Sequence, residues 1–176
     1  MVELMKLNEG KITLCEVPII FTFTKSMYYM QKELEKMAGE AWKRIFYDCG
    51  KIDGIGCNSN YVGIFHNDPE FQKIAADKFN AFSFCVDEFN KLGKGRLEII
   101  TTDKDKPLFV LRYYFSPIAL AYLEHERANK PVCYHFAGVF AGAANVVYPG
   151  IEVIETKCFA KGDPYCEFIF EIPKNR

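Results

Sequence analysis

The chain has 176 residues, of which 49% are apolar, 26% charged and 15% aromatic, as in a single compact, water-soluble domain. Its 22 basic and 23 acidic residues leave a net charge of -1, so no general electrostatic attraction to nucleic acid is built in. The longest apolar runs fall far short of the roughly 20 residues that a membrane span needs, and the first residues lack the pattern of a secretory signal. We therefore expect a cytoplasmic protein without a membrane span.

Strands followed by one long helix are expected in the N-terminal third. Alternating and apolar residues over 11–23 predict a strand or strand pair, so residues 1–24 are a candidate dimerisation or swap element. Apolar residues then recur at three- and four-residue steps, which predicts an amphipathic helix from near Ser26 to Gly50. Residues 50–63, rich in glycine and asparagine, have the composition of a loop.

The middle of the chain predicts a second helix and two strands. Asp68 and the proline after it are typical of a helix start, and an apolar helical face continues over residues 69–93. Residues 96–102 and 107–115 have the pattern of strands, and the second is so apolar that we expect it to be buried. The charged segment 103–106 is expected to be the turn between them.

The C-terminal third predicts two more helices and a hairpin. Ser116 and Pro117 are typical of a cap and a first helical turn. An unusually apolar helix is expected over 131–147, with Gly138 and Gly142 on one stripe that allows close backbone approach. Residues 151–172 then predict a terminal hairpin.

Seven cysteines, an odd number in a chain with a large core, argue against a disulfide framework in a reducing compartment. Three of them form a pattern with one glutamate. Cys158 and Cys166 are equally far from the centre of the hairpin turn, so their side chains are expected on one side of the sheet. Glu155, three residues before Cys158, points to the opposite face unless a bulge intervenes. With Cys133 on the apolar helix they are four candidate ligands, a set that suits zinc. From spacing alone, a metal site, a Cys158–Cys166 disulfide and inert core cysteines all remain open.

The same segment resembles the C-terminal signature of the 4-vinyl reductase domain family, in the elements Cys133-x4-Gly138-x3-Gly142, Ile154-Glu155-Thr156-x-Cys158 and Ala160-x-Gly162-Asp163-x2-Cys166. The domain also forms the sensor module of activators that respond to phenols and xylenes. The resemblance implies a structural zinc held by Cys133, Glu155, Cys158 and Cys166, beside an apolar ligand pocket. It also implies a single α+β domain over residues 1–176, with an antiparallel sheet packed against helices. This fold is related to the ligand-binding fold of NO-signalling and Golgi-transport proteins.

The expected pocket lies between the buried strand and the helices. Its candidate lining residues are Trp42, Phe109, Tyr113, Phe136 and Phe140. Ordinary core packing is the alternative for each of them. The stretch before Ser116 lacks the tryptophan and asparagine that the phenol sensors place there, so phenol itself is not implied.

Three functions fit this sequence. The preferred one is a sensor or carrier that binds a small hydrophobic or aromatic molecule, forms a homodimer and signals to a separate partner. The family name suggests instead a reductase for the vinyl group of a tetrapyrrole, although no cofactor or catalytic motif is found. A trafficking-type scaffold subunit is the third. The homodimer is also expected because Tyr28, Tyr29 and Tyr47 exceed what one core-facing side of a helix accounts for.

Overall fold

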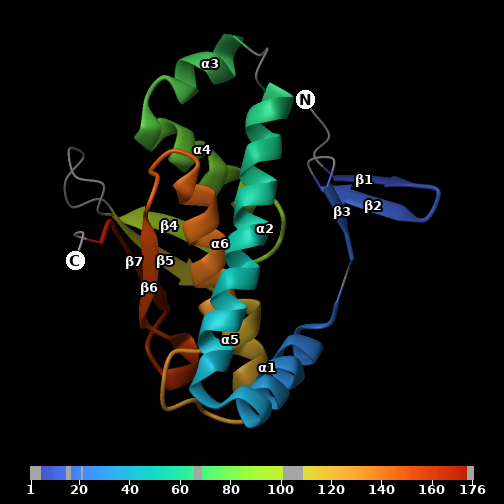
Figure 1. Cartoon of the computed structure of the whole chain (residues 1–176), viewed down its shortest axis with the longest axis vertical. Coiled ribbons are helices and arrows are strands. Elements are labelled where there is room, and N and C mark those ends of the chain that lie inside the picture. The colour runs from blue at the N-terminus through green and yellow to red at the C-terminus, as the bar shows by residue number, and fades with distance from the viewer. Residues whose placement is uncertain (1–4, 15–16, 21, 66–68, 101–108, 174–176) are drawn as a thin grey trace.

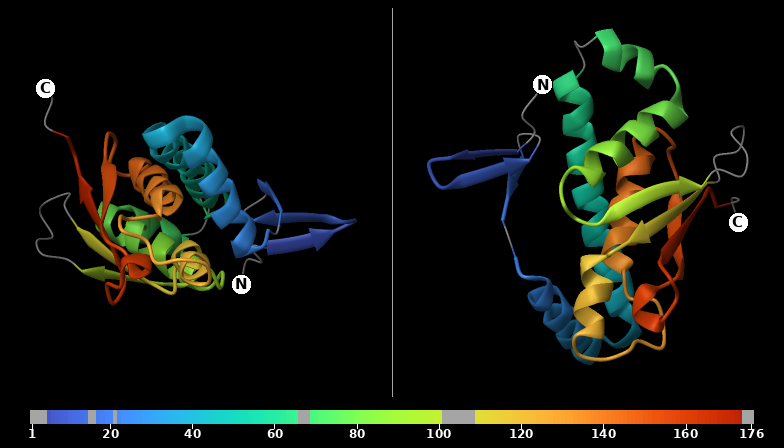
Figure 2. Two further views of the ribbon diagram at one scale, coloured as in Figure 1. Left: turned by 90° about the horizontal axis from the view of Figure 1, so that it is seen from below. Right: turned by 180° about the vertical axis from the view of Figure 1, so that it is seen from behind.

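The computed structural model describes residues 5–14, 17–20, 22–65, 69–100 and 109–173, without the side chains of residues 8 and 57–65. Helices pack against one face of a four-stranded antiparallel sheet, and a separate three-stranded sheet projects from the body beside them (Figures 1 and 2). The predicted α+β architecture is therefore confirmed. Among the described helices, none is both long and apolar enough to cross a membrane.

The projecting sheet is an antiparallel meander near the N-terminus. Its strands are β1 (Met5–Asn8), β2 (Lys11–Leu14) and β3 (Val17–Ile19). Most of its described side chains are exposed or half-buried, but Leu14 at the end of β2 is only 3% exposed. This leucine is the point at which the small sheet inserts into the body of the protein.

The main sheet has the strand order β4-β5-β7-β6, and every neighbouring pair is antiparallel. Its strands are β4 (Arg96–Ile100), β5 (Val110–Tyr114), β6 (Glu152–Lys157) and β7 (Cys166–Glu171). Alternate residues of β5 and β7 are buried, as the two-residue period of a strand requires when one face is covered. The predicted terminal hairpin is confirmed as β6 and β7.

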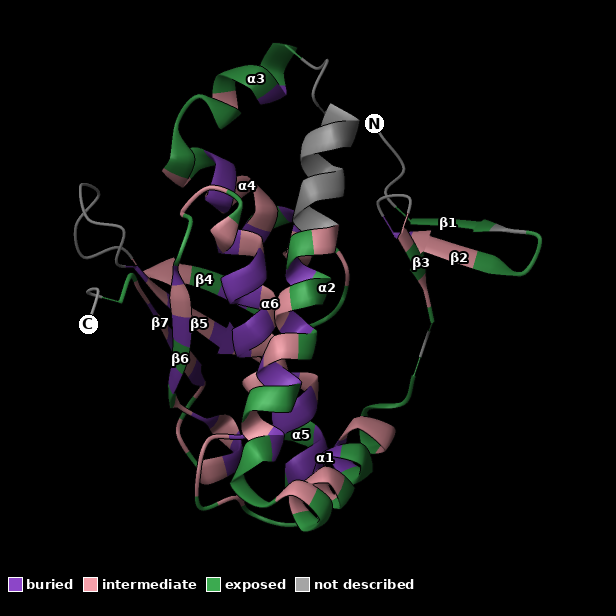
Figure 3. Ribbon diagram, in the orientation of Figure 1, coloured by how far each residue is buried: buried purple, intermediate pink, exposed green. Residues whose placement is uncertain are grey.

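The helices cover this buried face, and α6 runs through the centre of the layer (Figure 3). The helical elements are α1 (Thr24–Ala38), the 3-10 turn η1 (Gly39–Ala41), α2 (Trp42–Phe65), α3 (Pro69–Ala75), α4 (Lys78–Asn90), α5 (Pro117–Leu123), α6 (Tyr134–Asn145) and the 3-10 turn η2 (Phe159–Lys161). Helix α5 begins as predicted, with the Ser116 side chain as its cap and proline in its first turn.

The first long helix predicted from the sequence is in fact two helices, and the expected loop is part of the second. Gly39 has φ +55°, a left-handed conformation that ends α1. Gly50 does not stop α2, which continues to Phe65 through the glycine-rich segment. A Cβ atom on Gly50 would lie 2.0 Å from the carbonyl oxygen of His135, so this helix is held by close packing on α6. Tertiary contact thus outweighs the loop-like composition.

The second predicted helix is also two, because a break separates α3 from α4. The Asp77 side chain accepts a hydrogen bond of 2.9 Å from the backbone N–H of Asn80 and caps α4 anew. Helix α6 begins at Tyr134, three residues after the proline that was expected to open it. Asp68 and the turn at 103–106 lie outside the described residues.

Candidate metal centre

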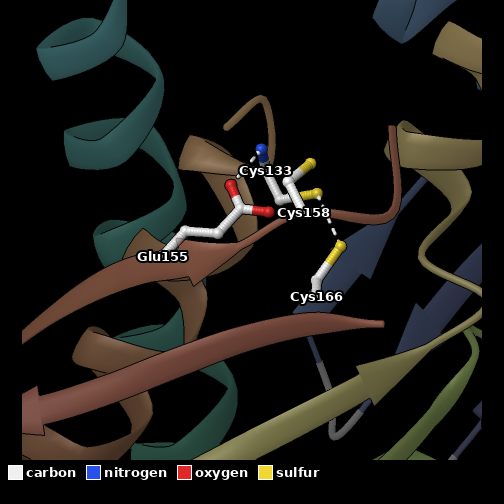
Figure 4. A group of neighbouring side chains, drawn as sticks. All are labelled: Cys133, Glu155, Cys158 and Cys166. Carbon is white, nitrogen blue, oxygen red and sulfur yellow. Dashed lines mark hydrogen bonds between the residues drawn. The ribbon is translucent and has the colours of Figure 1, made fainter. Parts of the chain in front are cut away.

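Four buried side chains from three segments meet at one end of the main sheet (Figure 4). Cys133 immediately precedes α6, Glu155 lies in β6, Cys158 follows that strand, and Cys166 begins β7. Their candidate ligand atoms all lie within 4.8 Å of one another. No disulfide joins the described cysteines, so the structure brings together all four predicted ligands as separate side chains. This buried cluster could hold a metal ion.

The strand irregularity that this arrangement requires is present. In the ladder of β6 and β7, Glu155 pairs with Phe168, whereas Lys157 pairs with Glu167, so the register shifts between these two residues of β6. The shift turns Glu155 onto the side of the sheet that carries the cysteines. A bulge was predicted at this place because residues three apart on a regular strand point to opposite faces.

The glutamate at the centre is incompletely satisfied. Its Oε2 atom accepts a hydrogen bond of 2.8 Å from the backbone N–H of Cys133, but its buried Oε1 atom has no hydrogen-bond partner in the described structure. Burial raises the pKa of Glu155 well above its usual range, because the charged form is poorly solvated there. A buried carboxylate oxygen without a donor indicates a cation among the three sulfurs.

The sulfur atoms are close enough to share protons. The Sγ atoms of Cys133 and Cys166 are 3.7 Å apart. Hydrogen bonds from Cys133 and from Cys166 lower the pKa of Cys158, while burial raises that of Cys133. One thiolate held by two thiols is the arrangement in which a divalent cation can replace the remaining protons.

Neutral donors surround the sulfurs. Ser116 Oγ lies 3.2 Å from Cys133 Sγ, and the backbone N–H of Phe159 donates to Cys166 Sγ over 3.3 Å. The start of α6 adds the positive end of a helix dipole. Sequence analysis missed these groups, of which only Ser116 carried a signal, as a predicted cap.

Charged neighbours named in the sequence analysis have other partners. Lys157, expected to offset the cluster's negative charge, pairs with Glu167 instead at 3.0 Å. His135 lies 3.1 Å from Asp53 of α2 and does not join the four ligands. Cys49 is exposed, Cys15 lies outside the described residues, and the side chain of Cys57 is not described.

An apolar cavity of about 80 Å³ lies on the other side of α6, bounded by α2, α4, β4 and the tip of β2. It is lined by Leu14, Gly54, Phe82, Cys85, Val86, Phe89, Leu92, Lys94, Leu97, Val139, Phe140 and Ala143. Leu14 belongs to the projecting sheet, so that sheet contributes to the wall. Sequence analysis did not connect Leu14, Cys85 or Lys94 with a pocket, since these residues converge only in the folded chain.

Of the five residues expected to line a pocket, Phe140 lines this cavity. Phe136 and Phe140 both pack against Tyr113, which is fully buried in the layer between α6 and the sheet. Phe109 packs on Phe170. Trp42 is fully buried with its ring against Tyr134, on the side of α6 that faces a more open hollow of about 320 Å³ beside Glu155.

Comparison with protein families matches residues 111–172 to the vinyl-4-reductase domain. A relative in Methanocaldococcus jannaschii, the uncharacterized protein MJ0855, is 30% identical over 148 residues, which are 80% of this chain. The match covers 51% of MJ0855, so the chain spans about half the length of this relative.

Solved structures with a similar fold include the phenol-responsive sensory domain of the transcription activator PoxR with phenol. It has a TM-score of 0.79 at 18% identity and covers 95% of this chain and 84% of that domain. Subunit 3 of a trafficking protein particle complex from Naegleria fowleri, covalently bound to palmitic acid, has a TM-score of 0.62 at 12% identity, over 86% and 95% of the two chains. An H-NOX protein from S. oneidensis has a TM-score of 0.51 at 14% identity, over 90% and 80%. These likenesses confirm the predicted fold.

Proposed function

Since residues 111–172 match the vinyl-4-reductase domain, which confirms the resemblance to the 4-vinyl reductase domain family, we propose that this protein binds a small hydrophobic molecule and acts as a sensor or carrier. The cavity enclosed by α2, α4, α6 and β4 is the observation that carries the proposal. It lies within a fold shared with the phenol-responsive sensory domain of PoxR. Apolar walls of this kind select a ligand by size and hydrophobicity.

The proposed metal is zinc, bound by Cys133, Glu155, Cys158 and Cys166. Three thiolates and one carboxylate are a donor set that zinc accepts in a tetrahedral shell. Four protein ligands leave no open position, so the zinc would brace the structure and would not bind a substrate. The unpartnered Oε1 atom of Glu155 supports this proposal.

We also propose a homodimer in a reducing, cytoplasmic compartment, with a separate signalling partner. Tyr28 and Tyr47 no longer support the dimer, because both are buried within the chain. Support comes instead from large apolar side chains left exposed on the projecting sheet, α1 and α2, namely Leu7, Ile20, Phe23, Met37 and Ile52. The absence of a disulfide among the described cysteines supports the compartment.

The dimer predicts a mass of twice the 20.2 kDa chain in light scattering at micromolar concentration. Ile52→Asp, on the exposed side of α2, should shift the mass toward the monomer, because it places a charge in the apolar contact. The matched control is Ile154→Asp on the main sheet, where the isoleucine is also exposed and the mass should not change. A monomeric wild-type chain would contradict the dimer.

Ligand binding predicts a concentration-dependent rise in melting temperature with small aliphatic and aromatic compounds. At a concentration 100 times Kd the stabilisation is about 2.7 kcal/mol, or a shift of about 5–10 °C for a chain of this size. Val139→Phe, which fills the cavity from α6, should abolish the shift, whereas Ile154→Phe outside the cavity should retain it. Differential scanning fluorimetry with a broad panel measures both.

If no compound of the panel stabilises the wild-type chain, the proposal fails. A scaffold role then becomes the better explanation, favoured by the likeness to a trafficking-complex subunit. Isolation of a stable complex with a second protein and without a bound small molecule would support that role.

A further inference from the structure

Lys94 sets the apolar cavity apart from ordinary core. Among the twelve residues that line the cavity, it alone carries a charge. It lies in the turn between α4 and β4, and its side chain is exposed to solvent at one side of the cavity. The cavity therefore combines an apolar interior with one cationic group at its edge.

The turn that carries Lys94 is held against β5. The hydroxyl of Tyr113, a fully buried residue, donates a hydrogen bond to the backbone carbonyl of Lys94. The next residue, Gly95, has φ +107°, and a Cβ atom there would lie 2.5 Å from the Tyr113 ring and 2.9 Å from the carbonyl oxygen of Tyr114. Glycine is thus required for the turn to lie this close to the strand. The backbone of Lys94 is thereby positioned at the cavity by the rings that also form its surroundings.

The other basic residues of the turn have intramolecular partners. Lys91 forms an ion pair with Glu88 of α4, and the guanidinium of Arg96 lies 4.1 Å above the ring of Tyr114. No carboxylate of the described chain forms an ion pair with the ammonium group of Lys94. An unpaired ammonium beside apolar walls favours an anionic partner that also covers those walls.

We infer that the ligand of this cavity is a small amphiphilic carboxylate, whose apolar body enters the cavity and whose carboxylate pairs with Lys94. This inference rests on the proposed function, since it names the class of ligand for the same site. The body is small, because the cavity of about 80 Å³ is smaller than the roughly 150 Å³ that encloses benzene. A short branched aliphatic chain fits this space better than a ring.

A pair of probes with the same carbon skeleton tests the headgroup. Isovalerate and 3-methylbutan-1-ol are titrated into the full chain by calorimetry at low salt. A charge-assisted hydrogen bond at a partly exposed site predicts binding of isovalerate about tenfold tighter than the alcohol. The preference should fall as salt is added, because the pair is reached by solvent ions.

Variants of the turn assign the preference to one side chain. Lys94→Met should bind the two probes with equal affinity, while Lys94→Arg should retain the preference for isovalerate. Lys91→Met removes a neighbouring positive charge that does not line the cavity, and the preference should remain.

The outcomes separate this inference from the proposed function. Equal affinity of the wild-type chain for the two probes, or an unchanged preference in Lys94→Met, would overturn the carboxylate assignment while leaving a hydrophobic ligand site in place. If neither probe nor any other compound binds, and Val139→Phe changes nothing, the proposed function itself fails.

Discussion

Replacing Cys133 with serine is expected to lower the melting temperature of the zinc-loaded protein by about 10 °C and to release the metal. Loss of a supporting contact around a metal costs 10–100-fold in affinity, and loss of a ligand costs more, which is about 3 kcal/mol or greater. For a chain of this length, each kcal/mol corresponds to a shift of about 2–4 °C. Cys133 should have the largest effect of the three cysteines, because it alone connects α6 to the hairpin.

The experiment compares melting temperature and bound zinc by native mass spectrometry, with and without a chelator. Cys49→Ser is the matched control, since Cys49 is exposed on α2 and outside the cluster. We expect one zinc per chain in the wild type and in the control. A chelator should lower the melting temperature of both to that of Cys133→Ser, because metal binding and folding are coupled. Identical melting curves for Cys133→Ser and the wild type would refute the structural role of the metal.

The second large effect is expected from a single methyl group between α2 and α6. A Cβ atom on Gly138 would lie 2.0 Å from the carbonyl oxygen of Tyr47 and 2.9 Å from the backbone nitrogen of Lys51. Both atoms belong to the backbone of α2, so no side chain can move aside, and the two helices would have to separate. Gly138→Ala should therefore destabilise the protein by about 3 kcal/mol or more, despite the better helix propensity of alanine.

Gly56→Ala is the matched control on α2, because a Cβ atom there meets nothing within 4 Å. This variant should be stabilised by up to about 1 kcal/mol, the difference in helix propensity between glycine and alanine. Urea or thermal unfolding of the two variants measures both effects. Equal stabilities for Gly138→Ala and Gly56→Ala would show that the backbones of α2 and α6 do not pack this closely.

The candidate metal centre was determined largely by local sequence. A tight hairpin places Cys158 and Cys166 near one another by chain geometry alone, and the bulge before Cys158 follows from the two-residue period of a strand. The α6 helix was predicted from its apolar residues, and its stripe of glycines predicted close approach to another helix. What the sequence could not show was which helix would approach.

The partner of that stripe is the segment that was expected to be a loop. Gly50 and Gly54 of α2 meet the backbone of α6, just as Gly138 and Gly142 meet the backbone of α2. Each glycine weakens an isolated helix, so local propensity predicts a break. In the folded chain the same missing side chains let two helices pack at short distance, and the packing compensates for the low propensity.

The cavity was likewise decided by tertiary structure. Leu14, Lys94 and Phe140 are separated by dozens of residues and come from a projecting sheet, a turn and a central helix. Aromatic content predicted that some cavity was plausible, but a void depends on how the side chains of several elements fail to fill the space between them. Such a space is a property of the assembled layers, because a side chain's neighbours across a core are set by packing and not by its place in the chain.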